Sequence, residues 1–353
     1  MLIVDVGLHI AKSKCKRRKD EREVKKLGIL ITHYNEPFKE CKFMFDTIST
    51  QRGIDFDDLE VIVVNDGNEN PITEDMLSEY PFKTQICTIE HGGVSKARNY
   101  ALMQSKADYT LFCDCDDGWL NNYSMHTIFS AMNENYDVIV GTFIEEQKAE
   151  LPNGEMGWRI ISHDKDMTFI HGKVFKRDFL IENDLKFDEN LTIHEDGYFV
   201  CLALTTAENK KYISFPIYLW KWNENSTVRK DSTDYVLKTY DNLMDCRISL
   251  MAQLRDRGFI SEFMDGVAKT VFDSYYDMQK PNALDPKNVV LVRKAEKAFK
   301  RFYEEYKDVY HECAVKRIAE IAFVSRANAF QNGLRIEQQT IREWLNHITK
   351  EVK

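Results

Sequence analysis

Short strand-like runs of apolar residues alternate with amphipathic segments through the first half of the chain. The runs at residues 27–32, 59–64 and 108–113 are each short enough for a buried strand, and residues 84–89 resemble them. Between them, residues 38–50 place apolar side chains among polar neighbours, as an amphipathic helix does. Strands that alternate with helices of this length predict a mostly parallel sheet with helices on both faces, and therefore an α/β fold. Further elements are expected at residues 94–105 (helix), 124–133 (helix) and 136–143 (strand).

The pattern changes after about residue 145. Residues 155–162 resemble part of a hairpin, residues 195–206 a helix, and nearly everything past Tyr235 is helical in pattern. Asp285-Pro286 supplies the cap acid and first-turn proline that favour a helix start. Two later signals are Gly333 as a helix end and Thr340 with Glu343 as a capping box.

These patterns divide the chain into three regions. We expect a basic N-terminal arm at residues 1–26, an α/β domain at residues 27–234 and a helical C-terminal domain at residues 235–353. A chain of 353 residues is long for one compact core, which agrees with one large domain and an appendage. The helical region is where we expect acceptor choice or assembly, including a homo-oligomer, to be determined.

Composition and charge narrow the class of protein. The net charge of −9 argues against a general nucleic-acid coat. The basic arm is interpreted as a solvated helix or mobile arm, with an anionic partner (a lipid surface or nucleic acid) as the alternative. No apolar run reaches the length of a membrane span, and the apolar start precedes the basic cluster, the reverse of a signal peptide. The eight cysteines contain no CxxC, so we expect reduced thiols and a cytoplasmic location.

Three acids, Asp114, Asp116 and Asp117, close the strand at residues 108–113. Like charges this close repel one another and raise one another's pKa, so a divalent cation is their natural partner. Carboxylates on a tight turn supply the hard oxygen ligands that Mg²⁺ or Mn²⁺ prefers. A solvated acidic turn is the alternative for the triplet taken alone.

An ordered series of motifs accompanies these acids. They are Thr32-His33-Tyr34-Asn35-Glu36, Val63-Val64-Asn65-Asp66-Gly67-Asn68, Gly92-Gly93-Val94-Ser95-Lys96-Ala97-Arg98-Asn99, His171-Gly172-Lys173-Val174-Phe175, His194-Glu195-Asp196-Gly197, Trp220-Lys221-Trp222 and Asn225-Ser226-Thr227-Val228-Arg229. With Asp114-Cys115-Asp116 as an Asp-x-Asp motif, the sequence from about residue 27 to residue 229 resembles a family 2 glycosyltransferase of the GT-A fold. The resemblance implies a Rossmann-like sheet and a nucleotide-sugar donor, UDP-linked by expectation.

The resemblance also assigns roles on the donor side. Asp66 would accept a hydrogen bond from the nucleotide base, although Asn65 departs from the acid that is commoner before it. Gly93 would let the backbone approach the ligand, and Arg98 would balance the diphosphate or the acids opposite. The residues placed at the donor are Thr32, Tyr34, Asn35, Glu36, Asp66, Gly93, Ser95, Arg98, Asn99, Asp114, Lys173, Trp222 and Arg229.

The metal and the catalytic base are assigned by the same resemblance. Asp116 would be the direct ligand of Mn²⁺ or Mg²⁺, with Asp114 nearer the ribose or a metal-bound water. Asp196 would remove the acceptor hydroxyl proton in an inverting transfer, and Glu195 would orient Asp196 or bind substrate. The alternative for this pair is an acidic helix start, which the helix dipole favours by itself. His171 is placed near the donor and His194 near substrate or metal, with a buried, hydrogen-bonded histidine as the alternative for each.

The expected function is therefore metal-dependent transfer of a single sugar from a nucleotide-sugar donor to a hydroxyl of a glycan, a protein, a small molecule or a modified nucleic-acid base. The Gln-x-x-Arg-Trp signature of processive membrane synthases is absent from the sequence. Two alternatives remain. One is a nucleotidyltransferase, which would need a glycine-rich activation loop after the first strand, and the other is a non-catalytic glycan-binding protein that retains the fold.

Overall fold

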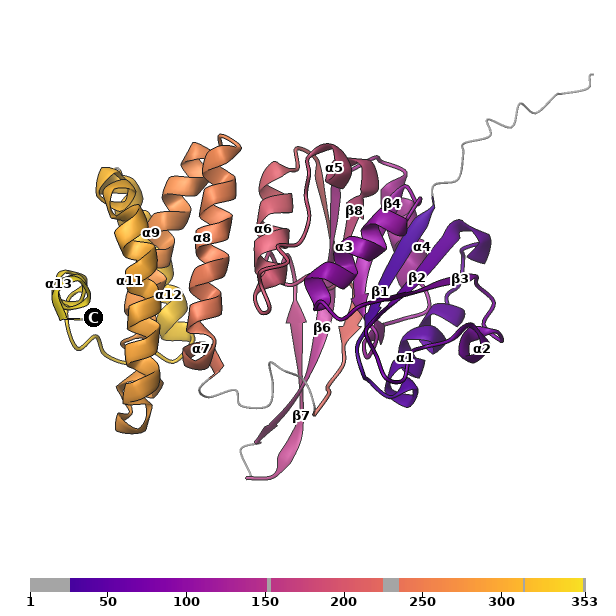
Figure 1. Cartoon of the computed structure of the whole chain (residues 1–353), viewed down its shortest axis with the longest axis horizontal. Coiled ribbons are helices and arrows are strands. Elements are labelled where there is room, and N and C mark those ends of the chain that lie inside the picture. Colours follow the sequence, from indigo (N-terminus) through magenta and orange to yellow (C-terminus); the bar gives the residue numbers. More distant parts are fainter. Residues whose placement is uncertain (1–25, 151–153, 225–234, 314, 352–353) are drawn as a thin grey trace, which may run out of the picture.

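The computed structural model describes residues 26–150, 154–224, 235–313 and 315–351. A single sheet with the strand order β3-β2-β1-β4-β8-β6-β9-β5, with β7 paired to β6, forms the α/β part (Figure 1). The strands are β1 (Leu27–His33), β2 (Leu59–Asp66), β3 (Thr84–Ile89), β4 (Tyr109–Asp114), β5 (Gly118–Trp119), β6 (Val138–Glu150), β7 (Met156–His163), β8 (Lys173–Lys176) and β9 (Lys210–Trp220). The α/β prediction is confirmed, and the strands expected from the apolar runs are all present.

Helices cover both faces of this sheet and form the rest of the chain. They are α1 (Phe38–Ser49), α2 (Glu74–Leu77), α3 (Val94–Gln104), α4 (Ser124–Met132), α5 (Arg177–Glu182), α6 (Glu195–Thr206), α7 (Tyr235–Lys238), α8 (Tyr240–Asp256), α9 (Ile260–Asp277), α10 (Pro281–Leu284), α11 (Val289–Glu312), α12 (Val315–Gln331) and α13 (Ile341–Glu351), with short 3-10 turns at Phe56–Asp58 and Pro286–Asn288. Among the described residues, none of the helices is both long and apolar enough to cross a membrane.

The first four strands in the sheet order, β3, β2, β1 and β4, are parallel. In this register Thr32 of β1 lies opposite both Val64 of β2 and Asp114 of β4. The carboxyl ends of these strands therefore meet at one edge of the sheet, where ligands of such folds bind.

The other half of the sheet is mixed. The short strand β8 runs antiparallel between β4 and β6, so it is a central strand of the sheet. Strand β6 pairs in parallel with β9 and continues past it as a hairpin with β7, which extends away from the sheet in Figure 1. The hairpin expected at residues 155–162 is confirmed.

Alternate residues of the parallel strands face two different cores, as the period of two requires. Ile29, Ile31 and Val63 belong to a core with α1 and α4. Leu30 and Phe112 face the other side, in a core that continues through α3 and α6 into the C-terminal helices. The sheet thus places α3 and α6 side by side on one face.

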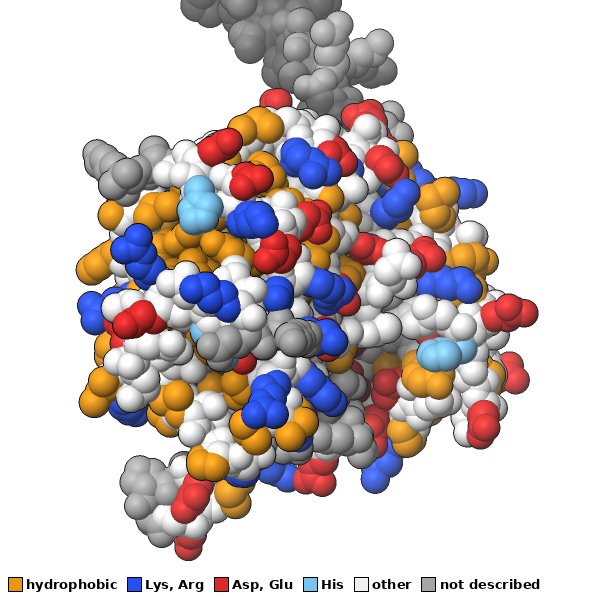
Figure 2. All heavy atoms as spheres, turned by 60° about the vertical axis from the view of Figure 1, so that its left-hand side comes forward, with side chains coloured by type: hydrophobic (Ala, Val, Ile, Leu, Met, Phe, Trp, Pro, Cys, Tyr) orange, Lys and Arg blue, Asp and Glu red, His pale blue; other side chains and the backbone are white. Residues whose placement is uncertain are grey.

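The C-terminal helices pack together, and α8 lies against α6 (Figure 1). The sequence signals for these helices are confirmed: Asp285 accepts a hydrogen bond from the Lys287 amide, and Gly333 follows α12 with a φ of +101°. Thr340 and Glu343 form the predicted reciprocal capping box. Figure 2 shows basic and acidic side chains interspersed with hydrophobic ones on this side of the molecule. The division into domains at residues 234 and 235 stays a prediction.

Candidate active site

A buried arginine joins three carboxylates at the carboxyl edge of the sheet. Arg98 Nη2 donates to Asp114 Oδ1 at 2.9 Å, while Nη1 donates to Glu195 Oε1 at 3.0 Å and to Asp196 Oδ1 at 2.6 Å. Arg98 is only 2% exposed, so these charge-assisted hydrogen bonds are shielded from water. The structure therefore brings together the predicted donor-side acid of β4 and the predicted base pair of α6.

The charge of Arg98 and the burial of the site act differently on the two flanking acids. Burial disfavours the ionised form of Asp114, but the adjacent Arg98 outweighs it and lowers the pKa of Asp114. Burial, followed by the charge of Asp196, raises the pKa of Glu195 to about 7 despite the attraction of Arg98. Glu195 therefore takes up a proton near neutral pH, and Asp114 stays ionised.

The first turn of α6 holds the predicted catalytic pair in place. His194 precedes the helix in the left-handed conformation, with a φ of 68°, and this turn starts the helix directly at Glu195. Asp196 Oδ2 accepts a hydrogen bond from the Ile170 amide at 3.2 Å. Both oxygens of Asp196 thus have fixed partners, and the carboxylate has a defined orientation. Burial lowers the pKa of His194 to about 4, so its imidazole is neutral at physiological pH.

The other two acids of the turn after β4 have separate partners. Asp116 Oδ2 accepts from Asn223 Nδ2 at 2.7 Å, and burial followed by the charges of Asp114 and Glu36 raises the pKa of Asp116 to about 6. Asp117 is buried, and it accepts from the Tyr218 hydroxyl at 2.9 Å and from the Lys221 amide at 3.0 Å.

A set of potential metal ligands lies beside these acids. The set consists of Asp114, Asp117 and His171. Each offers one ligand atom, and the three atoms lie within 4.8 Å of one another. His171 Nδ1 is 3.6 Å from Asp117 Oδ2, and burial lowers the pKa of His171 to about 4, which leaves a lone pair available. Two carboxylates and an imidazole in this arrangement fit a divalent cation. The assignment of Asp116 as the direct ligand stays a prediction, because this set of ligand atoms does not include it.

The loop after β3 brings an aromatic pair next to Asp66. The Asp66 carboxylate accepts from the Gly92 and Gly93 amides at 2.8 and 2.9 Å, and Gly93 has a φ of 86°. The ring of Tyr34 stacks on that of His91, with centroids 4.2 Å apart and planes 17° from parallel. The motif analysis included Tyr34 and missed His91, although His91 directly precedes the two glycines. The exposed Tyr34 ring and the buried Asp66 together offer a flat surface beside a carboxylate.

Several predicted donor contacts have partners within the protein. Ser95 donates to the Leu191 carbonyl at 3.3 Å, and Asn99 exchanges hydrogen bonds with the backbone of Phe187. These two side chains hold α3 to the loop before α6. Lys173 is fully buried on β8, with its Nζ 3.2 Å from Asp166. Their roles at the donor stay predictions.

The remaining predicted residues surround the same edge of the sheet. Thr32 is buried at the end of β1, Asn35 adopts a φ of 65°, and Glu36 Oε2 accepts from the Tyr34 amide at 2.8 Å. The Trp222 amide donates to Glu146 Oε2 at 3.0 Å. Arg229 and residues 1–25 of the basic arm predicted at residues 1–26 lie outside the described residues.

The comparison with protein families agrees with the geometry of this site. Residues 28–187 match the model of the family described as glycosyl transferase family 2. The match covers 160 of the 353 residues, and over this segment the chain is similar to glycosyl transferase family 2. The family region contains the acid cluster and Arg98, and it ends before Glu195 and Asp196.

Curated glycosyltransferases are similar to this chain over part of their length. The uncharacterized glycosyltransferase EpsJ of Bacillus subtilis (strain 168) is 26% identical over 222 residues, which are 57% of this chain and 62% of EpsJ. The poly(ribitol-phosphate) beta-N-acetylglucosaminyltransferase TarS of Staphylococcus aureus (strain MW2) is 23% identical over 55% of this chain and 35% of TarS. The matched regions thus span less than two thirds of these relatives.

Solved structures show the same fold. The crystal structure of S. aureus TarS 1-349 in complex with UDP-GlcNAc matches with a TM-score of 0.57 at 17% identity, over 86% of this chain and 92% of that one. The crystal structure of TarS 1-349 alone gives a TM-score of 0.58 at 16% identity over the same shares. At this identity the likeness establishes a GT-A glycosyltransferase fold that continues into the helical C-terminal region.

Proposed function

We propose that this chain transfers a single sugar from a UDP-linked donor to an acceptor hydroxyl, with inversion at the anomeric carbon and with Mn²⁺ or Mg²⁺ bound. The observation that carries the proposal is the arrangement around Arg98. Its guanidinium holds Asp114, on the predicted donor side, and Asp196, the predicted base, within 2.9 and 2.6 Å. A transferase that inverts needs a leaving-group side and a base close together, and this arrangement supplies both.

The donor side of the site would be formed by the ends of β1, β2 and β4. The stacked Tyr34 and His91 supply a flat surface for the nucleotide base, and Asp66 lies next to it. Asp114, Asp116, Asp117 and His171 would hold the cation, which when bound neutralises the diphosphate charge. Helix α3 starts at Val94, directly after Gly93, whose amide donates to Asp66, and a helix N-terminus favours an anion.

On the acceptor side, Asp196 would take the proton from the attacking hydroxyl. Its Oδ1 is bound to Arg98 and its Oδ2 to the Ile170 amide, so the carboxylate keeps one orientation before the acceptor arrives. Glu195, which binds the same Nη1 of Arg98, would keep the guanidinium in place. Positioning of this kind lowers the barrier because the groups need no rearrangement during the reaction.

The relatives suggest a class of acceptor. TarS is a poly(ribitol-phosphate) beta-N-acetylglucosaminyltransferase, and another relative, from Bacillus subtilis, is the minor teichoic acid biosynthesis protein GgaB. We therefore place a glycan acceptor of the polyol-phosphate type first, and UDP-GlcNAc first among the donors. Nucleic-acid binding through the basic arm falls outside the described residues. A homo-oligomer through the C-terminal helices and a cytoplasmic location stay predictions.

The test is a panel of nucleotide sugars, each with Mn²⁺, with Mg²⁺ or with a chelator, in which released nucleoside diphosphate is measured with and without an oligo(ribitol phosphate) acceptor. We expect release from one donor, dependent on the metal and faster with acceptor. The variant Asp196→Asn should lose transfer by about 10²–10⁴-fold, the usual contribution of a general base, while it still binds donor.

Asp178→Asn is the matched control for this variant, because Asp178 is an exposed carboxylate in the first turn of α5 and should leave transfer unchanged. A non-catalytic glycan-binding protein predicts no release from any donor. Transfer that survives in Asp196→Asn would contradict the assigned base. Release that continues in the chelator would contradict the metal.

A further inference from the structure

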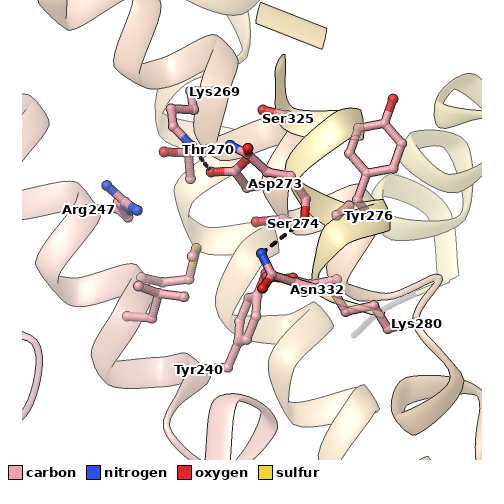
Figure 3. A pocket seen from close by; sticks show the side chains of 15 residues that line it. Tyr240, Arg247, Lys269, Thr270, Asp273, Ser274, Tyr276, Lys280, Ser325 and Asn332 are labelled. Atoms are coloured by element: carbon pink, nitrogen blue, oxygen red, sulfur yellow. Dashed lines mark hydrogen bonds and ion pairs between the residues drawn. The ribbon is translucent and has the colours of Figure 1, made fainter. Parts of the chain in front are cut away.

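A second cavity lies away from the sheet, among the C-terminal helices (Figure 3). It has a volume of about 280 Å³ and lies between α8, α9 and α12. Most of its lining is polar. The lining residues that the argument uses are Tyr240, Arg247, Asp273, Ser274, Ser325 and Asn328.

The charges that line this cavity do not cancel. Lys269 forms an ion pair with Asp273, and Lys280 Nζ lies 2.7 Å from Asp277 Oδ1. Arg247 also lines the cavity, and no ion pair to it occurs within the described parts of the chain. One positive charge is therefore left over, on a side chain with five hydrogen-bond donors.

Buried hydroxyls with few or no partners add a second, independent observation. The Ser325 hydroxyl makes no hydrogen bond to any described residue, and the Tyr240 hydroxyl has only Ser274 beside it; the two side chains are 2% and 1% exposed. A buried hydroxyl without a partner loses its hydrogen bonds to water without replacement, so such groups point to a missing ligand. Figure 3 shows Tyr240 and Ser325 on opposite sides of the group formed by Asp273, Ser274 and Asn332.

The helix that lines one side of this cavity, α8, also contacts the turn before the predicted catalytic base. On α8, Cys246 directly precedes Arg247, and its thiol donates to the His194 carbonyl at 3.4 Å. One turn earlier, Asn242 donates to Thr192 at 3.1 Å. The charge of Arg247 adds to the effect of burial in lowering the pKa of His194. Helix α8 therefore connects the cavity to the turn that starts α6 at Glu195 and Asp196.

We propose that this cavity binds one polyol-phosphate unit of the acceptor, next to the unit that receives the sugar. The inference rests on the proposed function, because it identifies the acceptor side of the same site. Arg247 would meet the single negative charge of a phosphodiester. The hydroxyls of Tyr240 and Ser325 and the exposed amide of Asn328 would meet the hydroxyls of the polyol. The volume is sufficient for one such unit.

The first test measures binding of three probes to the full chain by isothermal titration calorimetry. The probes are ribitol 5-phosphate, ribitol and inorganic phosphate, with UDP present to fill the donor side. We expect ribitol 5-phosphate to bind at least tenfold more tightly than either of the other two. The variant Arg247→Ala should weaken its binding about 10–100-fold, the usual effect of losing a charge-assisted hydrogen-bond partner.

Two further variants keep the test decisive. Arg255→Ala removes an exposed arginine from the same helix, whose ion-pair partner among the described residues is Asp256, and should not change the binding. Asn328 lines the cavity and is exposed, so Asn328→Leu should block the probe without unfolding the chain. Equal binding of ribitol 5-phosphate by wild type, Arg247→Ala and Asn328→Leu would overturn the proposal.

A further experiment tests whether the molecule bound in the cavity is part of the acceptor or a separate small molecule. If the cavity holds part of the acceptor, ribitol 5-phosphate should compete with oligo(ribitol phosphate) in transfer and raise its apparent KM. Binding without competition would mean a separate effector site and would overturn the proposal. Release of nucleoside diphosphate from the donor, without acceptor, reports on the proposed function alone: its absence would contradict that function whatever the cavity binds.

Discussion

At the scale of single residues, Arg98 is the side chain on which the site depends. It is buried, and it is the shared partner of Asp114, Glu195 and Asp196. Arg98 lowers the pKa of Asp114 against the effect of burial, whereas burial, followed by the charge of Asp196, raises the pKa of Glu195. Arg98 thus couples the end of β4 to the start of α6 through electrostatics rather than through apolar packing.

We therefore predict a large loss of stability in the variant Arg98→Met. Removing one partner of a buried ion pair leaves uncompensated charges, and this typically costs about 3–5 kcal/mol of the free energy of unfolding. Arg301→Met is the matched control, because Arg301 also pairs with two carboxylates, Asp241 and Asp245, but is 51% exposed. That variant should lose less than about 1 kcal/mol. Urea denaturation measures both, and equal losses would contradict the role given to Arg98.

At the scale of elements, the first turn of α6 places an acid where burial opposes its charge. Negative charge is favoured at a helix N-terminus, but burial and Asp196 raise the pKa of Glu195 from 4.5 to about 7. A raised carboxyl pKa stabilises the folded state below pH 4.5, and this stabilisation is lost as the pH rises through 7.

The resulting prediction concerns the difference between wild type and Glu195→Gln. Between pH 4.5 and pH 8 the free energy of unfolding of wild type should fall by about 2–3 kcal/mol relative to the variant, because only wild type releases this proton. Chemical denaturation at a series of pH values, without ligands, measures the difference. If the free energies of unfolding of wild type and variant keep a constant difference over this pH range, Glu195 ionises normally.

The strands and helices also show how much of this fold can be predicted from the sequence. The four parallel strands, β6 and the helices α1, α3, α4 and α6 followed from local patterns, because short apolar runs and capping residues act within a few residues of their position. The location of β8 did not, since its pairing with β4 and β6 depends on strands far away in the sequence. Lysines at both ends of β8 look solvent-exposed in sequence, yet Lys173 is buried beside Asp166.

The sequence motifs predicted which residues form the site, but they predicted less well which of these residues contact one another. Asp66, Arg98, Asp114 and Asp196 were all assigned from motifs, but their mutual distances depend on how α3 and α6 pack. The stacking of Tyr34 on His91 was missed because the two residues lie on different loops, after β1 and β3. Only the parallel register of the strands brings those loops together.

At the scale of the whole molecule, one apolar core extends through both regions. Leu30 and Phe112 of the sheet belong to the same cluster as Phe299 of α11 and Trp344 of α13, connected through α6 and α8. A division into two domains at residue 235 predicts separate stabilities, whereas a shared core predicts that the two regions unfold together. The contact between α6 and α8 joins the two parts of this core and therefore favours joint unfolding.

We predict cooperative unfolding of the two regions. In a Trp344→Phe background the four remaining tryptophans, Trp119, Trp158, Trp220 and Trp222, all lie in the α/β part, so their fluorescence reports on the sheet. Phe299→Ala, which removes a fully buried ring from α11, should cost about 3–5 kcal/mol and lower the urea midpoint of that fluorescence together with the far-UV dichroism. Phe323→Ala, at a side chain of α12 that is 74% exposed, should leave both midpoints in place. If Phe299→Ala shifts only the dichroism, the helical region unfolds by itself, and the shared core does not couple it to the sheet.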